Sequence, residues 1–345
     1  MQFFFTEEDD SANVRGADIR NALAKARHRV IHGKFGQTPP EGTDVWMHGL
    51  GKYSEPPPPP LEPSFAKLLL SSNAQLVLFQ LCDAASMSFY RIPDELARNT
   101  RLFLRNHWPK DELSIPEQFR GRIGFLPPML KPMKPKAGKT LQARSQASIF
   151  IGTRTGRSNL PDGRNARVET VRIMRSSGLP FIGGLLSHPE YESIPPELLM
   201  PKMSGRKHAR LLEESKFCLA PWGNHPITYR FFEGLAHRCL VVAQSLGNTR
   251  FLDGGLEPGK HYVEVRSDLS DLAELVGYYS NHLDEAQRIA DAGFAHYVRY
   301  FARSGSGISQ WLFDASVASW GNLYQANGNS GIIAATRAYV SRLFA

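Results

Sequence analysis

The chain has 345 residues, of which 42% are hydrophobic and 10% aromatic, and its formal net charge is +8 with an isoelectric point near 9.4. This length suits two domains that each bury a core, and the composition is that of a globular protein. The basic balance favours anionic partners: nucleic acid, an anionic membrane surface or phosphate-bearing small molecules. No apolar run approaches the roughly 20 residues that a membrane-spanning helix needs, which argues against an integral membrane protein.

The cysteines and the first residues indicate a reducing compartment. Cys82, Cys218 and Cys239 lie in apolar, strand-like runs, without the spacing of metal ligands or of a disulfide framework. The start M-Q-F-F-F-T-E-E-D-D lacks a basic region and turns acidic after five residues, unlike a signal peptide. We therefore expect a cytoplasmic protein.

The first part of the chain alternates predicted strands and helices, which is typical of a parallel, doubly wound sheet. We expect strands at 2–6, 44–48, 75–81 and 102–106 and helices at 13–30, 63–71 and 88–98, with residues 124–127 closing this half. The proline run 56–60 is predicted to stiffen a loop as polyproline II, with a partner-docking segment as the alternative.

The second part repeats the rhythm after a segment at 128–146 whose proline, lysine and glycine content is typical of a linker. We expect strands at 148–152, 180–184, 217–220, 240–243 and 261–265, helices at 165–176, 206–214 and 228–237, and a long helical region at 267–300 broken near Gly293. The predicted domains are 1–127 and 147–308, followed by terminal helices within 309–345 that pack back on the first domain.

The stretch 215–242 predicts strand, sharp turn, helix and strand, which is a βαβ unit. Ligands bind such sheets outside the carboxyl ends of the strands, where the turn 221–226 lies. Thr228 can cap the helix, and Arg230 and Glu233 share one of its faces. An arginine beside the free N–H groups of a first helical turn suits a diphosphate, whereas an exposed ion pair is the alternative.

A second basic feature follows the strand at 148–152, in a glycine-containing loop with four arginines: Arg154, Arg157, Arg164 and Arg167. In a parallel sheet this loop lies on the same edge as the turn 221–226. Guanidinium groups bind phosphate in a bidentate manner, so the two loops together suit a diphosphate. The alternatives are a solvated basic loop and nucleic-acid binding, although the aromatic side chains of a stacking platform are missing.

These segments resemble the exostosin-type glycosyltransferases. The resemblance rests on I-F-I-G-T-R at 149–154, on S-K-F-C-L-A-P-W-G at 215–223, and on Arg230 followed by E-G-L-A-H-R-C-L-V-V at 233–242. It covers mainly residues 148–265. The chain departs from the family where Arg238 replaces a small glycine and where 240–242 lacks a proline, so donor identity is not transferred.

The resemblance implies an α/β, GT-B-like fold of two Rossmann-like domains whose parallel sheets face a central cleft. It implies that Arg230 faces the diphosphate of a nucleotide-sugar donor, that Glu233 holds ribose or sugar hydroxyls, and that the loop 152–154 closes on the phosphates. The full set of expected donor-binding residues is Gly152, Thr153, Arg154, Arg157, Pro221, Gly223, His225, Tyr229, Arg230 and Glu233. No cofactor beyond this donor is expected.

An inverting sugar transfer also needs a base for the acceptor hydroxyl, which we expect at a strand end of the first domain. Side chains of the right type follow four strands: Glu7, Glu8, Asp9 and Asp10, then His48, then Asp83, then His107. We favour Asp83 and His48 as catalytic residues; a retaining reaction needs no such base. No D-x-D motif lies at a strand end, so we expect no metal.

The favoured function is a glycosyltransferase that moves a sugar from a nucleotide-sugar to a saccharide or glycolipid acceptor, in cell-surface polysaccharide synthesis. The basic balance predicts peripheral contact with an anionic membrane surface. A nucleotide-sugar epimerase of the same architecture and a non-catalytic, basic nucleic-acid-binding protein are the alternatives, because one fold hosts many functions. Of these partners, nucleic acid is the one we least expect.

Overall fold

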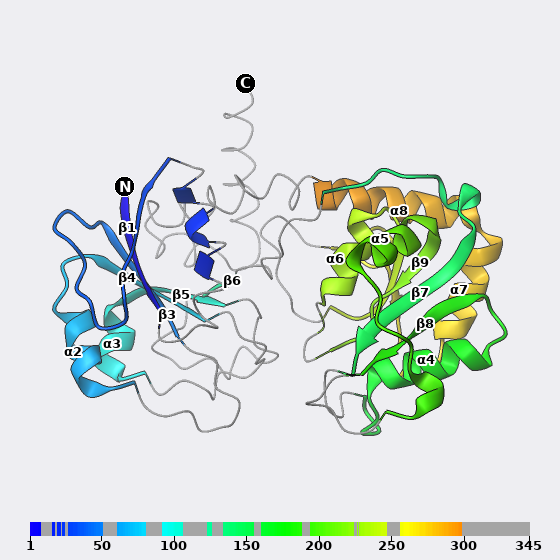
Figure 1. The fold of residues 1–345 in the computed structure, drawn as a ribbon, viewed down its shortest axis with the longest axis horizontal. Coiled ribbons are helices and arrows are strands. Elements are labelled where there is room, and N and C mark those ends of the chain that lie inside the picture. The colour runs from blue at the N-terminus through cyan, green and yellow to red at the C-terminus, as the bar shows by residue number, and fades with distance from the viewer. Residues whose placement is uncertain are drawn as a thin grey trace. The chain divides into compact units, whose positions relative to one another are not determined.

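The computed structural model describes residues 1–7, 16–17, 19–21, 23–24, 27–50, 61–80, 92–105, 123–125, 134–154, 160–187, 194–223, 226, 228–246 and 256–298. They form two compact units, one of the described residues up to 125 and one of those from 134 onward (Figure 1). Each unit is built on a parallel sheet with helices on its faces, so the expected α/β class with two Rossmann-like domains is confirmed.

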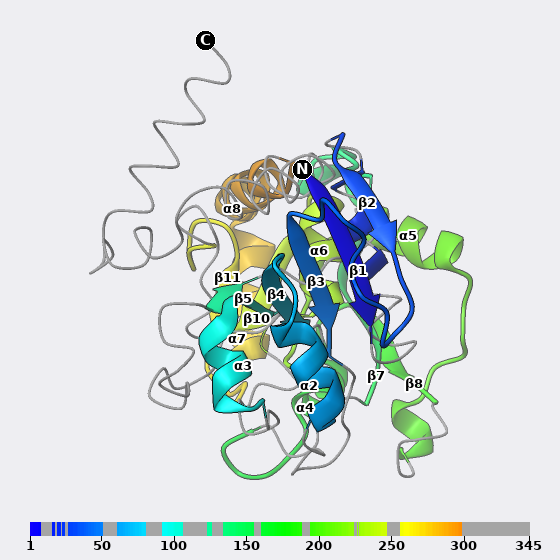
Figure 2. The same ribbon diagram turned by 90° about the vertical axis from the view of Figure 1, so that its left-hand side faces the viewer.

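The first unit holds a six-stranded sheet in the order β2-β1-β3-β4-β5-β6, and every neighbouring pair is parallel. Its described elements are β1 (Gln2–Glu7), β2 (Arg29–His32), β3 (Val45–Gly49), α2 (Pro63–Leu70), β4 (Gln75–Gln80), α3 (Asp94–Asn99), β5 (Thr100–Arg105) and β6 (Ile123–Phe125). Figure 2 shows α2 and α3 beside each other, and both contribute to one apolar core with Phe4, Trp46 and Leu78.

The second unit holds a five-stranded parallel sheet in the order β11-β10-β9-β7-β8. Its elements are η4 (Leu141–Ala143), β7 (Gln146–Thr153), α4 (Ala166–Ser176), β8 (Phe181–Leu186), η5 (Pro196–Leu198), α5 (Gly205–Glu214), β9 (Ser215–Leu219), α6 (Tyr229–Ala236), β10 (Leu240–Gln244), β11 (Val263–Val265), α7 (Leu272–Asn281) and α8 (Leu283–Tyr297).

The two faces of this sheet carry alternate residues of each strand, as the period of two requires. Phe150 and Phe217 point to the face that α4 and α7 cover, whereas Ile149 and Cys218 point to the face that α5 covers. Helix α6 joins α5 on the second face, because a Cβ on Gly234 would lie 2.8 Å from Cys218 Cβ. The helix with the candidate site therefore packs directly on the central strand β9.

The helix predicted at 13–30 ends earlier than expected. The described residues between 16 and 24 are helical, but Arg27 has a φ of 64° and Val30 lies in strand β2, opposite Phe3 of β1. The β-branched pair Val30-Ile31 thus extends the sheet, since parallel pairing outweighs the helical spacing of the apolar residues. The sequence analysis missed this edge strand and also β6.

The break in the long helical region lies between α7 and α8, at His282, and not at Gly293. Gly293 lies inside α8, where a Cβ would stand 2.4 Å from the carbonyl oxygen of His261. The glycine is needed for this close approach between helix and backbone, so it does not end the helix.

The described part of the predicted linker 128–146 packs on the second unit. Within it, Leu141 is fully buried in the core of the second unit, and the Lys136 N–H donates to the carbonyl of Ala236 at 2.8 Å. Arg144 is also buried, with 3% of its surface exposed. Residues 134–145 thus form part of the second unit. The proline run 56–60, Cys82 and the predicted terminal helices lie outside the described residues.

Candidate functional site

The turn after β9 is fixed to the end of the neighbouring strand β10. The backbone N–H of Trp222 donates to Gln244 Oε1 at 3.0 Å, and its indole N–H donates to the carbonyl of Ser245 at 2.8 Å. Pro221 and Gly223 are buried on either side of this indole. These two hydrogen bonds hold Trp222 at the carboxyl edge of the sheet, the edge at which parallel α/β sheets bind ligands.

The start of α6 carries a network of three charged or polar side chains. Arg230 forms an ion pair with Glu233 through Nη1, and this nitrogen also donates to His208 Nε2 of α5 at 3.1 Å. The Arg230 and Glu233 side chains are 20% and 19% exposed. The expectation that they share one helix face is confirmed, and each is accessible enough to meet a ligand.

Burial and charge set the protonation of this network. Since guanidinium groups only donate, His208 accepts at Nε2 and carries its proton on Nδ1. Burial, and after it the Arg230 charge, lower the pKa of His208 to about 4. Burial raises the pKa of Glu233, although Arg230 acts in the opposite direction. At neutral pH His208 is therefore a neutral acceptor beside the ion pair of Arg230 and Glu233.

The first turn of α6 has the features of an anion site. Thr228 occupies the N-cap position, yet its side chain makes no capping hydrogen bond, contrary to expectation. Its hydroxyl oxygen is buried without a hydrogen-bond partner among the described residues. Helix N-termini attract anions through the backbone N–H groups of their first turn, which have no partner within the helix. Tyr229 is 58% exposed at this turn, and His225 lies outside the described residues.

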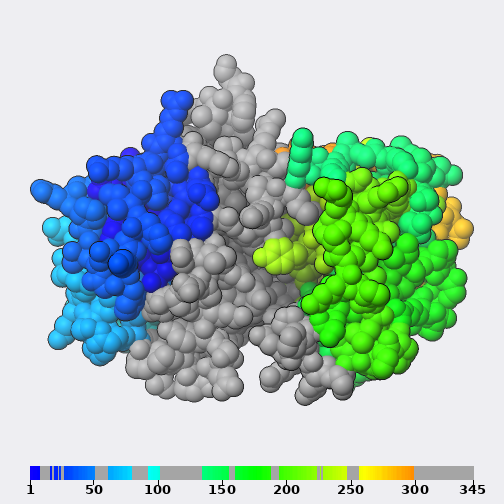
Figure 3. Space-filling model, viewed as in Figure 1, coloured from blue at the N-terminus to red at the C-terminus, as the bar shows by residue number. Residues whose placement is uncertain are grey.

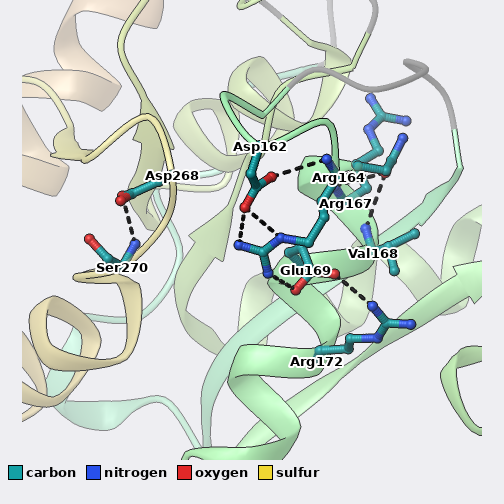
Figure 4. Close-up of polar contacts among 9 residues, drawn as sticks. Asp162, Arg164, Arg167, Val168, Glu169, Arg172, Asp268 and Ser270 are labelled. Atoms are coloured by element: carbon teal, nitrogen blue, oxygen red, sulfur yellow. Dashed lines mark hydrogen bonds and ion pairs between the residues drawn. The ribbon is translucent and has the colours of Figure 1, made fainter.

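Two of the four arginines in the loop after β7 bind groups of the loop or of α4. Arg164 binds two carboxylates, with Nε 2.6 Å from Asp162 Oδ2 and Nη1 2.6 Å from Glu169 Oε2 (Figure 4). Arg167 donates to the carbonyl of Thr153 at 2.9 Å. Both arginines thus stabilise the loop itself. Arg154 is partly buried, and Arg157 lies outside the described residues.

The register of β7 and β9 brings the two loops to one edge of the sheet. Ile149 pairs with Cys218 in parallel, so Gly152 and Thr153 at the end of β7 lie on the same edge as the turn after β9. This confirms the expected topology of the two segments, while the roles of their residues stay predictions.

The two helices that carry the site are joined by a buried arginine, Arg144, which was predicted to lie in the linker. Arg144 donates to backbone carbonyls at the ends of two helices: Leu212 in the last turn of α5 and Ser215 just after it, and His237 and Arg238 after α6. His208 was also missed, although it stands four residues before the buried Leu212 on the inward face of α5. That spacing was the available signal.

Among the candidate bases of the first unit, His48 is fully buried on β3. The Trp46 indole N–H donates to Thr6 Oγ1 at 2.8 Å, and Thr6 Oγ1 lies 2.9 Å from His48 Nδ1. The Thr6 hydroxyl can donate to Nδ1 or accept from it, since a hydroxyl has one proton and two lone pairs. The role of His48 as a general base stays a prediction.

The other candidates are either engaged or outside the described residues. Glu7 binds Arg20 through Oε1 and His32 Nε2 through Oε2, the latter at 2.6 Å. Both carboxylate oxygens are therefore occupied. Five candidates lie outside the described residues: Glu8, Asp9, Asp10, His107 and the favoured Asp83. Within the described ranges no group of three or more His, Cys, Asp or Glu is arranged to hold a metal ion, and no helix is both long and apolar enough to cross a membrane.

Comparison with known proteins finds similarity to glycosyltransferases. Residues 181–303, which include α5, α6 and the Arg230–Glu233 pair, match the family described as glycosyl transferase-like. A search of curated protein sequences found no match.

Solved structures agree over most of the chain. A glycosyltransferase from Rickettsia africae ESF-5 superposes with a TM-score of 0.55 at 10% identity, covering 92% of this chain and 98% of its own. A sucrose-phosphate synthase from Thermosynechococcus elongatus gives a TM-score of 0.55 at 11% identity, covering 95% and 100%. At such identities the likeness shows the fold alone. The exostosin type is not among these findings and stays a prediction. The chain thus has the GT-B-like fold of glycosyltransferases, and its second unit carries a glycosyl transferase-like segment.

Proposed function

We propose that this protein transfers a sugar from a nucleoside-diphosphate sugar to a saccharide or glycolipid acceptor, without a metal, in polysaccharide biosynthesis. The observation that carries the proposal is the Arg230–Glu233–His208 network at the start of α6, on the ligand edge of the sheet and inside the segment that matches glycosyl transferases. A nucleotide-sugar epimerase and a nucleic-acid-binding protein remain the alternatives.

The chemistry follows from the charge that develops on the leaving group. When the glycosidic bond to the donor breaks, negative charge grows on the diphosphate, and preorganised cations and N–H donors stabilise it. Arg230 and the first turn of α6 supply both. Glu233, whose raised pKa reflects burial, accepts hydrogen bonds from ribose or sugar hydroxyls, and Gly152, Thr153 and Arg154 approach the phosphates from β7.

The first experiment measures binding of UDP, GDP and ADP to the full chain by calorimetry, with and without EDTA. We expect one of these nucleotides to bind, equally well with EDTA. Arg230→Ala should weaken binding about 10- to 100-fold, since a hydrogen bond to a charged group contributes about 1.5–3 kcal/mol. Glu233→Gln should affect the nucleotide-sugar more than the diphosphate alone.

The chain offers a matched control on α4. Arg172 forms an ion pair with Glu169 at the same i, i+3 spacing, and its side chain is half exposed. Arg172→Ala should leave nucleotide affinity unchanged. If no nucleotide binds, or if Arg172→Ala and Arg230→Ala act alike, the donor assignment is wrong. Turnover of a nucleotide-sugar without an acceptor, beyond slow hydrolysis, would favour an epimerase.

We also propose that the protein is cytoplasmic and meets an anionic membrane surface through the outward side of α5. Lys202, Arg206, Lys207 and Arg210 are exposed along and just before this helix. Each basic residue near an anionic surface contributes about 1 kcal/mol. Sedimentation with phosphatidylserine vesicles should be lost when these four residues become glutamine; retention by the variant would contradict the assignment.

A further inference from the structure

The first unit has an unusually exposed phenylalanine, Phe35. Phe35, in the loop after β2, is 48% exposed, although phenylalanine is among the residues most often buried. Its ring lies 4.3 Å from that of Phe65 on α2, at an angle of 34°. The Phe65 ring in turn lies 4.8 Å from the imidazole of the fully buried His48. We call these three residues the aromatic stack: one face of its outermost ring rests on the core, and nearly half of that ring is open to solvent.

The loop holds Phe35 in place. The backbone N–H of Lys34 donates to Gln37 Oε1 at 2.7 Å, and the N–H of Gln37 donates to the carbonyl of Lys34 at 3.1 Å. Gly36 takes the left-handed conformation this turn requires, with φ at 83°. The N–H of Gly33 donates to the carbonyl of Phe5 at 2.8 Å, which ties the turn to β1. Little ordering entropy therefore remains to be lost when a ligand meets the ring.

The stack lies at the ligand edge of the first sheet. Strand β2 runs parallel to β1, with His32 opposite Phe5, and Phe35 follows three residues after His32. His48 occupies the corresponding position near the end of β3. Ligands of open parallel sheets bind beyond these carboxyl ends. Figure 3 shows the medium-blue part of the chain that contains this loop at the surface of the first unit.

The surroundings of Phe35 indicate the class of ligand. Among the residues that the structure describes, the exposed large hydrophobic side chains are Met1, Phe35, Tyr229 and Tyr278. Phe35 is thus a single apolar surface, far smaller than the patches of a few hundred Å² that mark protein or membrane interfaces. Exposed polar residues flank it, namely His32, Lys34 and Gln37. One flat apolar face with a polar rim matches a pyranose ring, which presents C–H groups on one face and hydroxyls at its edge.

We propose that Phe35 is the platform on which a pyranose ring of the acceptor stacks. This inference rests on the proposed function, because it assigns the acceptor side of that reaction to the first unit. The loop's polar groups then face the sugar hydroxyls, and the stack beneath fixes the plane of the ring.

The test is saturation-transfer difference NMR on the full chain, with and without UDP, using methyl pyranosides of glucose, galactose, mannose and N-acetylglucosamine. We expect at least one pyranoside to receive saturation, most strongly on one C–H face. Phe35→Leu should weaken its binding about three- to tenfold, the range expected for loss of an aromatic contact, whereas Phe35→Tyr should retain it. Tyr278→Ala is the matched control, because this tyrosine is exposed to a similar extent, 45%, on α7 of the second unit.

The outcomes separate this proposal from the donor assignment. Normal UDP affinity in Phe35→Leu, together with loss of pyranoside binding, supports the platform. Absence of any pyranoside signal in the wild type, or equal losses in Phe35→Leu and Tyr278→Ala, overturns it while leaving nucleotide binding untouched. Vesicle binding that depends on Phe35 in place of pyranoside binding would also overturn it, in favour of a lipid contact. Pyranoside binding at Phe35 in a chain that binds no nucleotide would instead refute the donor assignment alone.

Discussion

Replacing Arg144 with methionine should markedly lower the free energy of unfolding of the second unit, although Arg144 lies in the segment before β7. The Arg144 guanidinium is buried, and it donates to carbonyls at the carboxyl ends of α5 and α6 at 2.7–3.4 Å. Within the described part of the chain, the acceptors of this guanidinium are carbonyl oxygens and the sulfur of Cys239. Its charge is therefore balanced by the negative ends of two helix dipoles.

The magnitude follows from these contacts. Each hydrogen bond to a charged group contributes about 1.5–3 kcal/mol, and a cation at a helix C-terminus adds about 0.3–1 kcal/mol. These contributions are not additive within one network. We expect Arg144→Met to lower the free energy of unfolding by about 3–5 kcal/mol, as when one partner of a buried ion pair is removed. Arg144→Lys should lose about half as much, because a single ammonium group does not reach both helix ends.

Urea denaturation followed by tryptophan fluorescence measures this effect, since Trp222 reports on the turn beside α6. Arg172→Met serves as the control, because this arginine is half exposed and its surface ion pair is worth about 1 kcal/mol or less. If Arg144→Met unfolds within about 0.5 kcal/mol of the control, the two helix ends do not depend on the guanidinium and the reasoning fails.

Two further predictions concern the helices that Arg144 joins. His208 has a folded pKa of about 4 against an ordinary 6.5, so between these values only the unfolded chain takes up this proton. Stability should therefore fall as pH drops through this window, by about 1–2 kcal/mol once solvent screening of the partly exposed side chain is included. His208→Asn should remove this fall, while the opposing effect of the raised Glu233 pKa persists in both proteins. The measurement is the urea midpoint of each protein at pH 7 and at pH 4. If the difference between wild type and variant is the same at both pH values, the assignment to His208 is wrong. Gly234→Ala should cost about 1–3 kcal/mol, because its Cβ would lie 2.7 Å from Val241 Cγ2. Gly277→Ala, in open space on α7, should raise the thermal midpoint, and equal shifts in both glycine variants would contradict the packing argument.

Local patterns in the sequence were sufficient for the core of the second unit. The apolar runs of β9 and β10 and the prolines and glycine between them predict strand, turn and helix, and the structure places each as expected. The i, i+3 spacing of Arg230 and Glu233 likewise predicts their shared face. In these cases the residues that determine the structure lie within one stretch of chain.

Long-range contacts account for what the sequence analysis missed. Val30 fits a helical period, and only its pairing with β1 makes it a strand residue. Gly293 predicts a helix break, but the structure shows that the glycine is needed because the backbone of His261 packs closely against α8. In the sequence Arg144 resembles one more cation of a basic linker, because the helix-end carbonyls that it binds are 68 to 94 residues away. Partners at such separations leave no local pattern.

The two missed residues, His208 and Arg144, bind the same pair of helices at opposite ends. His208 joins the first half of α5 to the start of α6 through Arg230, and Arg144 joins the ends of both helices. Helices α5 and α6 therefore run side by side in the same direction, fixed to each other at each end and packed on β9. The guanidinium that we propose as the anion receptor at the start of α6 thus has its position set by two partners, Glu233 and His208. Because charge stabilisation without reorganisation is what a leaving diphosphate requires, this double attachment is the feature of the fold that best fits sugar transfer.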